Sequence, residues 1–368
     1  MNRTFKIGVI GATAQGDYGH GLDTAFGASE RATILTVADD DPAGLKSAVD
    51  RLGVEHQYLS YERMLEEEDL DIVCIGPRWV TERVSMVQAC AAAGCHIYCE
   101  NPLAGTLVDV DAICRAVEEA NVKMALAHQF HGAATIVKTI KDLTDGVYGK
   151  LLRMYARPKD DPRGGGEELM VHGCHLFNLM IAFAGEPRWA CAHMSVEGRD
   201  VETTDRREGT EPVGPIAGDS VTATFGFENG VRGFFDSTAN IAPAEGSLYG
   251  LRLECEHALL HIRSQAEVSI YPAPIVMPEK KELRWQRLIV PEWHMDSDGQ
   301  PRDLKRWLHD GNRALAEDLM DAIENEREPA TSLKSAKVAM EMIQGVYTSH
   351  FAGRRLKIPL EVREHPLS

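Results

Sequence analysis

Short runs of apolar residues recur along the first third of the chain and predict buried strands. The first run, FKIGVIG, covers residues 5–11. Similar runs follow at residues 32–39, 71–76, 96–100 and 122–128. Strands without polar alternation are typical of a parallel sheet that is covered on both faces. We therefore expect a parallel sheet in this part of the chain.

The residues between these runs have the spacing of amphipathic helices. Four apolar positions would share one helix face, namely Val80, Val84, Val87 and Ala91. Gly94 stands where that helix would end. Regular alternation of strands and helices predicts the fold class α/β, with a doubly wound parallel sheet of the Rossmann type. We assign this domain to residues 1–130.

The hydrophobic pattern changes in the second part of the chain. Apolar residues alternate over 221–227, Asn229-Gly230 follows, and a second alternating run begins at Val231, which predicts a β-hairpin. The spacing predicts a large open, mostly antiparallel sheet over residues 150–300. We therefore assign 131–368 to a C-terminal α/β domain.

Two further features of this domain can be read from the pattern. The polar stretch 196–218 predicts a loop insertion or a mobile flap. Helical spacing returns at 311–325 and 332–352, and Thr331 or Ser332 is a suitable cap for the second helix.

Composition and charge limit the classes of partner. The chain has 368 residues and a net charge of -17, and a surface that neutralises nucleic-acid phosphates needs clustered Lys and Arg instead. We find neither a run of 18 apolar residues nor an apolar leader, so we expect a cytoplasmic protein without a membrane span. Its eight cysteines in a chain of this length do not suggest a disulfide framework.

A glycine-containing turn, residues 11–16 (GATAQG), follows the first strand and predicts a dinucleotide site. It is a degenerate form of the fingerprint in which a Gly-rich turn joins a strand to a helix that binds the pyrophosphate. The predicted contacts in the turn are Gly11, Ala12, Thr13 and Gly16. Asp39 ends the second strand, where a carboxylate can bind ribose hydroxyls. Because three consecutive acids begin there and would repel a 2′-phosphate, we expect NAD(H) to be favoured over NADP(H).

Five segments together resemble the Gfo/Idh/MocA family of NAD(P)-dependent oxidoreductases. They are the turn at 8–16, Asp39, Ile75-Gly76-Pro77, the run Cys99 to Ala104, and Gly164-Gly165-Gly166 leading to Gly173-Cys174-His175. The resemblance implies an N-terminal Rossmann domain, a C-terminal domain with a broad open sheet, and a homodimer or homotetramer formed through that sheet. It also implies that Pro77, Glu100 and Asn101 contact the cofactor. Gln129 follows the fifth predicted strand, where a parallel sheet presents residues to its ligand, so we expect it to contact the cofactor too.

The chain departs from this family at residues that normally carry chemistry. The family's Glu-Lys-Pro is Glu100-Asn101-Pro102 here, so the lysine that binds the reacting hydroxyl is replaced by an amide. The family's Asp-x-Gly-x-His-x-x-Asp is residues 171–178 (VHGCHLFN), which keeps His175 and loses both acids. A histidine that usually follows the strand-four proline is replaced by Thr81.

These residues suggest how a hydroxyl could be oxidised. His175 is the candidate acceptor of the hydroxyl proton, and Asn101 can donate a hydrogen bond. His172 lies three residues earlier, so on one helix it would share a face with His175 and act as a second base or an orienting group. Candidate substrate contacts are His128, Glu167, Glu168 and Asn178. The spacing of His172, Cys174 and His175 does not favour a metal site.

Three functions remain open at this point. The first is NAD-dependent oxidation of a secondary hydroxyl of a sugar, glycoside or cyclitol. The second is a redox-neutral glycosidase, lyase or epimerase that uses NAD through a transient keto-sugar. The third is a dinucleotide-binding protein without catalytic activity, because a fold does not guarantee chemistry.

Overall fold

The computed structural model describes residues 4–243 and 247–368. Its contacts form two compact units. Unit 1 contains residues 1–132, 211–214 and 308–337, and unit 2 contains the remaining segments, 133–210, 215–307 and 338–368. The sequence-based division was a single boundary at 130/131, whereas the contacts group residues 308–337 with the N-terminal unit.

Unit 1 contains a parallel sheet of six strands, which confirms the predicted Rossmann domain. Its strands are β1 (Phe5–Ile10), β2 (Ala32–Ala38), β3 (His56–Tyr58), β4 (Ile72–Ile75), β5 (His96–Cys99) and β6 (Met124–Leu126). They lie in the order β3-β2-β1-β4-β5-β6, and all paired strands run parallel. The strand order therefore reverses beside β1, and such switch points are where α/β sheets bind ligands.

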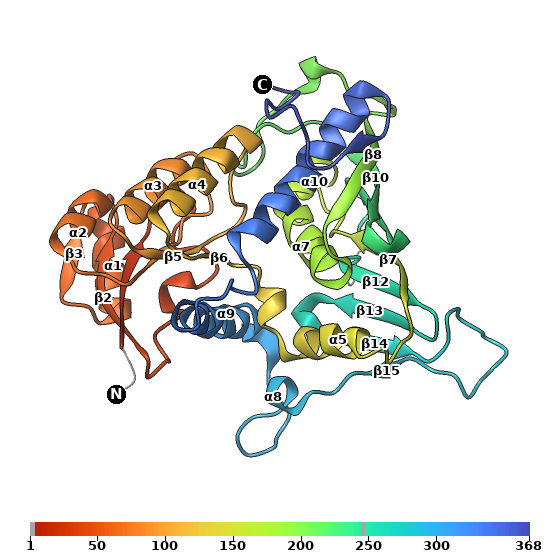
Figure 1. Cartoon of the computed structure of the whole chain (residues 1–368), viewed down its shortest axis with the longest axis horizontal. Coiled ribbons are helices and arrows are strands. Elements are labelled where there is room, and N and C mark those ends of the chain that lie inside the picture. The colour runs from red at the N-terminus through yellow and green to blue at the C-terminus, as the bar shows by residue number, and fades with distance from the viewer. Residues whose placement is uncertain (1–3, 244–246) are drawn as a thin grey trace. The chain divides into compact units, whose positions relative to one another are not determined.

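Helices cover this sheet, and Figure 1 shows α3 and α4 side by side on one of its faces. The helices are α1 (Pro42–Leu52), α2 (Tyr61–Glu67), α3 (Arg83–Ala92), α4 (Leu107–Ala120) and α9 (Trp307–Glu324). Asp41, Ser60 and Thr106 cap the first, second and fourth by accepting a backbone N–H in the first turn. Leu315 and Leu319 of α9 pack into the same core as Phe5 and Tyr98, which explains why this late helix belongs to unit 1.

The helix expected directly after the Gly-rich turn is absent. Residues 11–31 form turns and one short 3-10 helix, Leu22–Thr24. Positive φ angles at Ala14, Gly16 and Asp17 and at two later glycines, Gly19 and Gly21, interrupt any continuous α-helix. The turn therefore lacks the helix N-terminus that binds pyrophosphate in the usual fingerprint.

Unit 2 is built on one mixed sheet of ten strands. They are β7 (Leu151–Arg157), β8 (Pro187–Val196), β9 (Arg199–Asp200), β10 (Ser220–Phe227), β11 (Arg232–Thr238), β12 (Gly250–Cys255), β13 (Leu259–Arg263), β14 (Val268–Tyr271), β15 (Gln286–Arg287) and β16 (Leu356–Lys357). The main path is β15-β14-β13-β12-β7-β11-β10-β8-β16, and β9 pairs with β8. Only the β7–β11 pairing among these strands of the described chain is parallel, so the mostly antiparallel sheet is confirmed.

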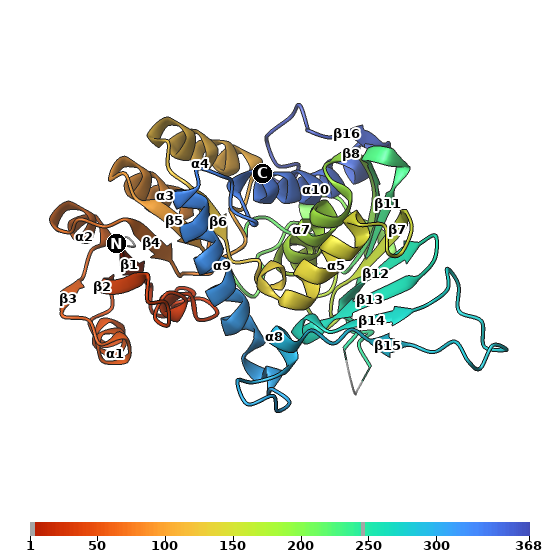
Figure 2. The ribbon, with the colours of Figure 1, turned by 60° about the horizontal axis from the view of Figure 1, so that its bottom comes forward.

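The predicted hairpin is β10–β11, and Asn229 and Gly230 both have positive φ at its turn. The remaining helices are α5 (Ala134–Thr144), α6 (Gly166–Val171), α7 (Gly173–Ala184), α8 (Pro291–His294) and α10 (Leu333–Ala352). Figure 2 shows α5, α7 and α10 on one face of the sheet. Ser332 accepts a hydrogen bond from the Ser335 backbone at the start of α10, which matches its predicted capping role. Among the described residues, no helix is both long enough and apolar enough to cross a membrane.

Candidate active site

A cleft of about 210 Å³ lies at the carboxyl ends of β1, β2 and β4 in unit 1. Gly11, Ala12, Asp39 and Pro77, four of the predicted cofactor contacts, are among its lining residues. Further acids line it as well, namely Asp40, Glu62 and Glu82. No lysine or arginine is among the described residues that form its wall, so the cleft has a negative local charge.

Asp39 is almost fully buried, and both of its oxygens already bind the protein. Its Oδ1 accepts hydrogen bonds from the backbone of Thr13 at 3.2 Å and of Asp41 at 3.0 Å. Its Oδ2 accepts the hydroxyls of Thr13 and Tyr18, each at 2.7 Å. A carboxylate has about four acceptor positions, and these four hydrogen bonds therefore use the full acceptor capacity of Asp39. Asp40 is exposed in the same cleft and has no hydrogen-bond partner within the described chain.

Close approaches of the backbone explain the two glycines of the turn. A Cβ on Gly11 would lie 2.2 Å from the Tyr18 ring, and one on Gly16 would lie 2.4 Å from the Arg78 nitrogen. Gly16 also has φ +94°, which L residues rarely adopt. The Ala14 N–H donates to the Asp17 carboxylate at 3.0 Å. The turn is thus a compact loop that Asp17 and Asp39 hold from within.

Buried polar groups gather after β5 and β6, where a parallel sheet presents side chains to its ligand. Glu100 is fully buried, and its Oε1 lies 2.6 Å from His20 Nδ1, which raises the pKa of His20. Its other oxygen, Oε2, and Nε2 of the buried Gln129 have no partner in residues 4–243 and 247–368. Asn101 donates to the Ala127 carbonyl at 3.3 Å. One unsatisfied acceptor and one unsatisfied amide donor fit a polar cofactor, so this end of unit 1 fits a dinucleotide.

His128 and Arg83 are buried in the same unit. Burial, with a smaller effect of His131, lowers the pKa of His128 to about 3, so its imidazole is neutral. Arg83 begins α3 and is fully buried, although the sequence pattern placed Val80 and Val84 on that face. Its guanidinium donates to the carbonyls of Pro77 and Glu100, and it therefore holds the ends of β4 and β5.

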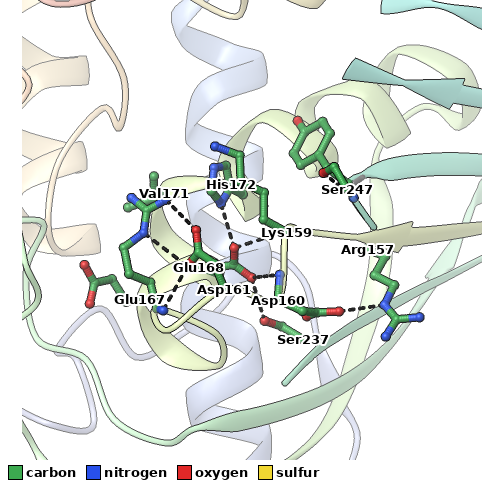
Figure 3. A network of polar contacts seen from close by, with 12 residues as sticks. Arg157, Lys159, Asp160, Asp161, Glu167, Glu168, Val171, His172, Ser237 and Ser247 are labelled. Atoms are coloured by element: carbon green, nitrogen blue, oxygen red, sulfur yellow. Dashed lines mark hydrogen bonds and ion pairs between the residues drawn. The ribbon is translucent and has the colours of Figure 1, made fainter. Parts of the chain in front are cut away.

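Figure 3 shows a polar network in unit 2 that is centred on Glu168 of α6. This carboxylate is fully buried, and its Oε1 accepts from the Lys159 backbone at 3.1 Å. Its Oε2 accepts from the Asp160 backbone at 2.9 Å and from the Ser237 hydroxyl at 3.2 Å. The glycine run before α6 allows this packing, because a Cβ on Gly166 would lie 2.1 Å from the Ala217 carbonyl oxygen.

His172 contacts this carboxylate from the residue that separates α6 from α7. Its Nδ1 lies 3.2 Å from Glu168 Oε1, within ion-pair distance but without the geometry of a hydrogen bond, and its side chain is 11% exposed. The Tyr249 ring packs edge-on against the imidazole, with centroids 5.6 Å apart. Burial lowers the pKa of His172; the Glu168 carboxylate opposes this shift, and the charges of Lys159 and Arg163 add to it. A neutral imidazole backed by a carboxylate is suited to accept a proton.

The other predicted residues of unit 2 lie close by in the chain but have different surroundings. Glu167 is buried and anchors the 203–210 segment by accepting the backbone N–H and the hydroxyl of Thr210 and pairing with Arg207 at 3.4 Å. His175 is half-buried in the first turn of α7, and Asn178 is buried one turn later. His172 and His175 do not lie on one uninterrupted helix, because α6 ends at Val171 and α7 begins at Gly173.

Sequence signals for the residues that were missed are weak. Arg83 is spaced four residues before Val87, so a helical pattern could have placed it on the buried face. In the sequence, Asp40 is only the middle member of the acidic run 39–41, and nothing in that run separates its role from that of Asp39. Lys159 has no motif around it, and only the fold brings it to Glu168. Within the described residues no group of three or more His, Cys, Asp or Glu is arranged to hold a metal ion.

Two family models match almost the whole chain. Residues 5–128 match the oxidoreductase family model for an NAD-binding Rossmann fold, and residues 154–360 match the family's C-terminal alpha/beta domain. The chain belongs to the Gfo/Idh/MocA oxidoreductase family. The family membership inferred from the five sequence segments is thereby confirmed, and several relatives are named dehydrogenases, among them those for D-apiose, D-xylose and myo-inositol.

Relatives of this Gfo/Idh/MocA protein are distant in sequence. A D-apiose dehydrogenase from Paraburkholderia graminis is 24% identical over 91% of this chain and 85% of its own length. Dehydrogenase aclE from Aspergillus oryzae is also 24% identical, over 53% of this chain and 59% of its own length. A levoglucosan dehydrogenase in complex with NADH and levoglucosan has a TM-score of 0.76 and 17% identity over 97% of this chain and 100% of that one.

Proposed function

We propose that this protein is an NAD-dependent oxidoreductase that oxidises a secondary hydroxyl of a sugar, glycoside or cyclitol. The observation that carries the proposal is the His172–Glu168 pair in a chain of this family, because it supplies a neutral imidazole with a fixed carboxylate behind it. The names of the D-apiose and levoglucosan relatives support the substrate class. The redox-neutral and non-catalytic alternatives become outcomes of the test.

The residues of unit 1 would hold the dinucleotide, which supplies hydride acceptance when bound. Gly11, Ala12, Thr13 and Gly16 would form the turn beneath it, and Pro77 would line the cleft. Glu100 Oε2 and Gln129 Nε2 would satisfy polar groups of the cofactor. We propose that Asp40 contacts the ribose hydroxyls, while Asp39 holds the turn through Thr13 and Tyr18. The acidic wall supports a preference for NAD(H), because a 2′-phosphate would meet only like charge.

The residues of unit 2 would handle the hydroxyl proton. His172 would accept it, and Glu168 would fix the tautomer and the orientation of the ring. His175 would assist from the next turn, and Asn101 of unit 1 can donate a hydrogen bond but cannot supply a charge. Asn178 and the buried His128 would contribute polar contacts, whereas Glu167 would act indirectly by anchoring the 203–210 segment.

We also propose that the protein forms a homodimer or homotetramer through the open face of the large sheet. This face carries Tyr155 stacked on Phe234 at 4.8 Å, with the Arg252 guanidinium 4.5 Å above Tyr155. Light scattering would test the proposal, and a monomer at micromolar concentration would contradict it. A cytoplasmic location remains a prediction that fractionation of the native host can test.

The decisive experiment is a screen of sugars, glycosides and inositols with NAD, read by NADH absorbance and by chromatography of the products. We expect NADH to accumulate with at least one substrate. His172→Ala and His175→Ala should each lower turnover, and general base catalysis typically contributes about 10²–10⁴-fold. Product formation without net NADH would support the redox-neutral alternative, and NADH binding without any product would support a non-catalytic protein.

A further inference from the structure

The polar network of unit 2 contains several cations, and most of them are paired with acids. Arg157 donates to Asp160 at 2.6 Å, and Arg163 forms a two-pronged pair with Asp161. Arg207 pairs with Glu167, as described above. These guanidinium groups are neutralised and are therefore poor candidates for stabilising a new charge.

Lys159 is the exception in this network. Its backbone N–H donates to Glu168, but its ammonium forms no hydrogen bond or ion pair with the residues that the structure describes. Figure 3 shows its side chain running alongside the His172 ring. The residue is exposed, whereas Glu168 and His172 are buried, so the ammonium stands at the solvent side of the pair.

The position of Lys159 is set by the same carboxylate that orients His172. Two successive backbone N–H groups, of Lys159 and Asp160, clamp Glu168, and Nδ1 of His172 lies 3.2 Å from it. His172 Nε2 makes no hydrogen bond with the described residues, so it is available to a substrate. The charged and titratable groups around the ring are Lys159, Asp161 and Arg163 between β7 and α6, Glu168 in α6, and Tyr249 just before β12.

We propose that Lys159 is a catalytic residue that binds the reacting hydroxyl oxygen of the substrate beside His172. The inference rests on the proposed oxidation. Lys159 brings a positive charge to the His172–Glu168 pair, and such a charge can stabilise an oxygen that becomes negative during the reaction. An ammonium that has no partner among the described residues and lies beside an available imidazole has the required chemistry.

The step balances when a dinucleotide is bound to accept the hydride. The carbinol carbon would lose hydride, the O–H proton would pass to His172 Nε2, and the C–O bond would become a carbonyl. Lys159 keeps its proton and donates a hydrogen bond to the oxygen while negative charge develops there. Its charge also favours the neutral form of His172 before the reaction, and Glu168 stabilises the imidazolium that forms.

The test compares Lys159→Met, Lys159→Arg and Lys159→Ala with the control Lys150→Gln. Lys150 is an exposed lysine of the same unit at the start of β7, and its side chain has no partner in the described chain. With the substrate found in the sugar screen, Lys159→Met should lower kcat by about 10²–10³-fold, the usual effect of removing one charge-stabilising donor. NADH affinity should change less than about twofold, and Lys159→Arg should retain more activity than Lys159→Met.

Two further readouts separate a catalytic amine from a structural one. Small alkylamines should restore part of the turnover of Lys159→Ala, which a purely structural role would not allow. NMR titration of His172 in the protein without cofactor should give a higher pKa in Lys159→Met than in the control, because a nearby positive charge has been removed.

The outcomes distinguish this inference from the proposed function. If wild-type protein oxidises a sugar but Lys159→Met turns over within about threefold of the control, the catalytic role of Lys159 is refuted. An unchanged His172 pKa in Lys159→Met would show that the ammonium does not lie close to the His172 ring, and the proposed role of Lys159 would be refuted. If the wild type oxidises no sugar although the His172 shift is present, the proposed function fails and the catalytic role of Lys159 fails with it.

Discussion

The two neighbouring acids of the cleft, Asp39 and Asp40, should have separable roles. Asp39 accepts four hydrogen bonds, two from backbone N–H groups and two from hydroxyls, whereas Asp40 is exposed and unpartnered in the described chain. Hydrogen bonds to a charged group are worth about 1.5–3 kcal/mol and neutral ones about 0.5–1.5 kcal/mol. Asp39→Asn loses about 1 kcal/mol for each bond, and the amide nitrogen now faces two donors. Summed over the four bonds, we therefore expect a loss of at least about 4 kcal/mol in the free energy of unfolding.

Asp40→Asn should leave the free energy of unfolding nearly unchanged and weaken NADH binding instead. Surface substitutions usually change stability by less than about 0.5 kcal/mol. Losing the charge at one ribose contact should weaken NADH binding by about 1.4 kcal/mol, which is about tenfold. Urea denaturation followed by tryptophan fluorescence gives the stabilities, and fluorescence titration gives the NADH affinities. If Asp39→Asn is as stable as the wild type and binds NADH more weakly than Asp40→Asn, Asp39 is the ribose ligand and our assignment is wrong.

Three other predictions follow from the same site. Wild-type protein should bind NADH more tightly than NADPH, and Asp40→Arg should reverse this order while the exposed control Asp50→Arg does not; tighter NADPH binding by the wild type would contradict the preference. The pKa of His128 is lowered to about 3 by burial, so the unfolded chain takes up a proton first as the pH falls below about 6.5. Stability should then decline by about 1.4 kcal/mol per pH unit between pH 6 and 4, and less steeply in His128→Gln; equal slopes in urea melts would exclude this source. Asn101→Lys should leave turnover unchanged or lower it, because Asn101 is buried and donates to the Ala127 carbonyl, so a charged side chain there would be costly; a large gain would show that Asn101 is a weakened form of the family's lysine.

Much of the candidate site could be located from the sequence because the strands of unit 1 carry their own signal. Each strand end predicted from an apolar run lies within a few residues of the observed one, so Asp39, Pro77, Glu100 and His128 were placed at the correct edge of the sheet. Their environments were not predictable. Asp39 was expected to bind ribose, yet Tyr18 folds back onto it because the intervening turn has no helix.

Local features could be read directly from the amino-acid sequence. They are the period of apolar residues, the Asn229-Gly230 turn, the capping Ser332 and the motif segments that identify the family. Tertiary structure alone decided the long-range facts. Helix α9 joins the first unit because its leucines complete a core whose other residues lie far earlier in the chain, between Phe5 and Ala127. Glu168 became a buried acceptor because donors from β11 and from the loop after β7 converge on it. Burial of a charge depends on such distant partners, and no local pattern of residues encodes them.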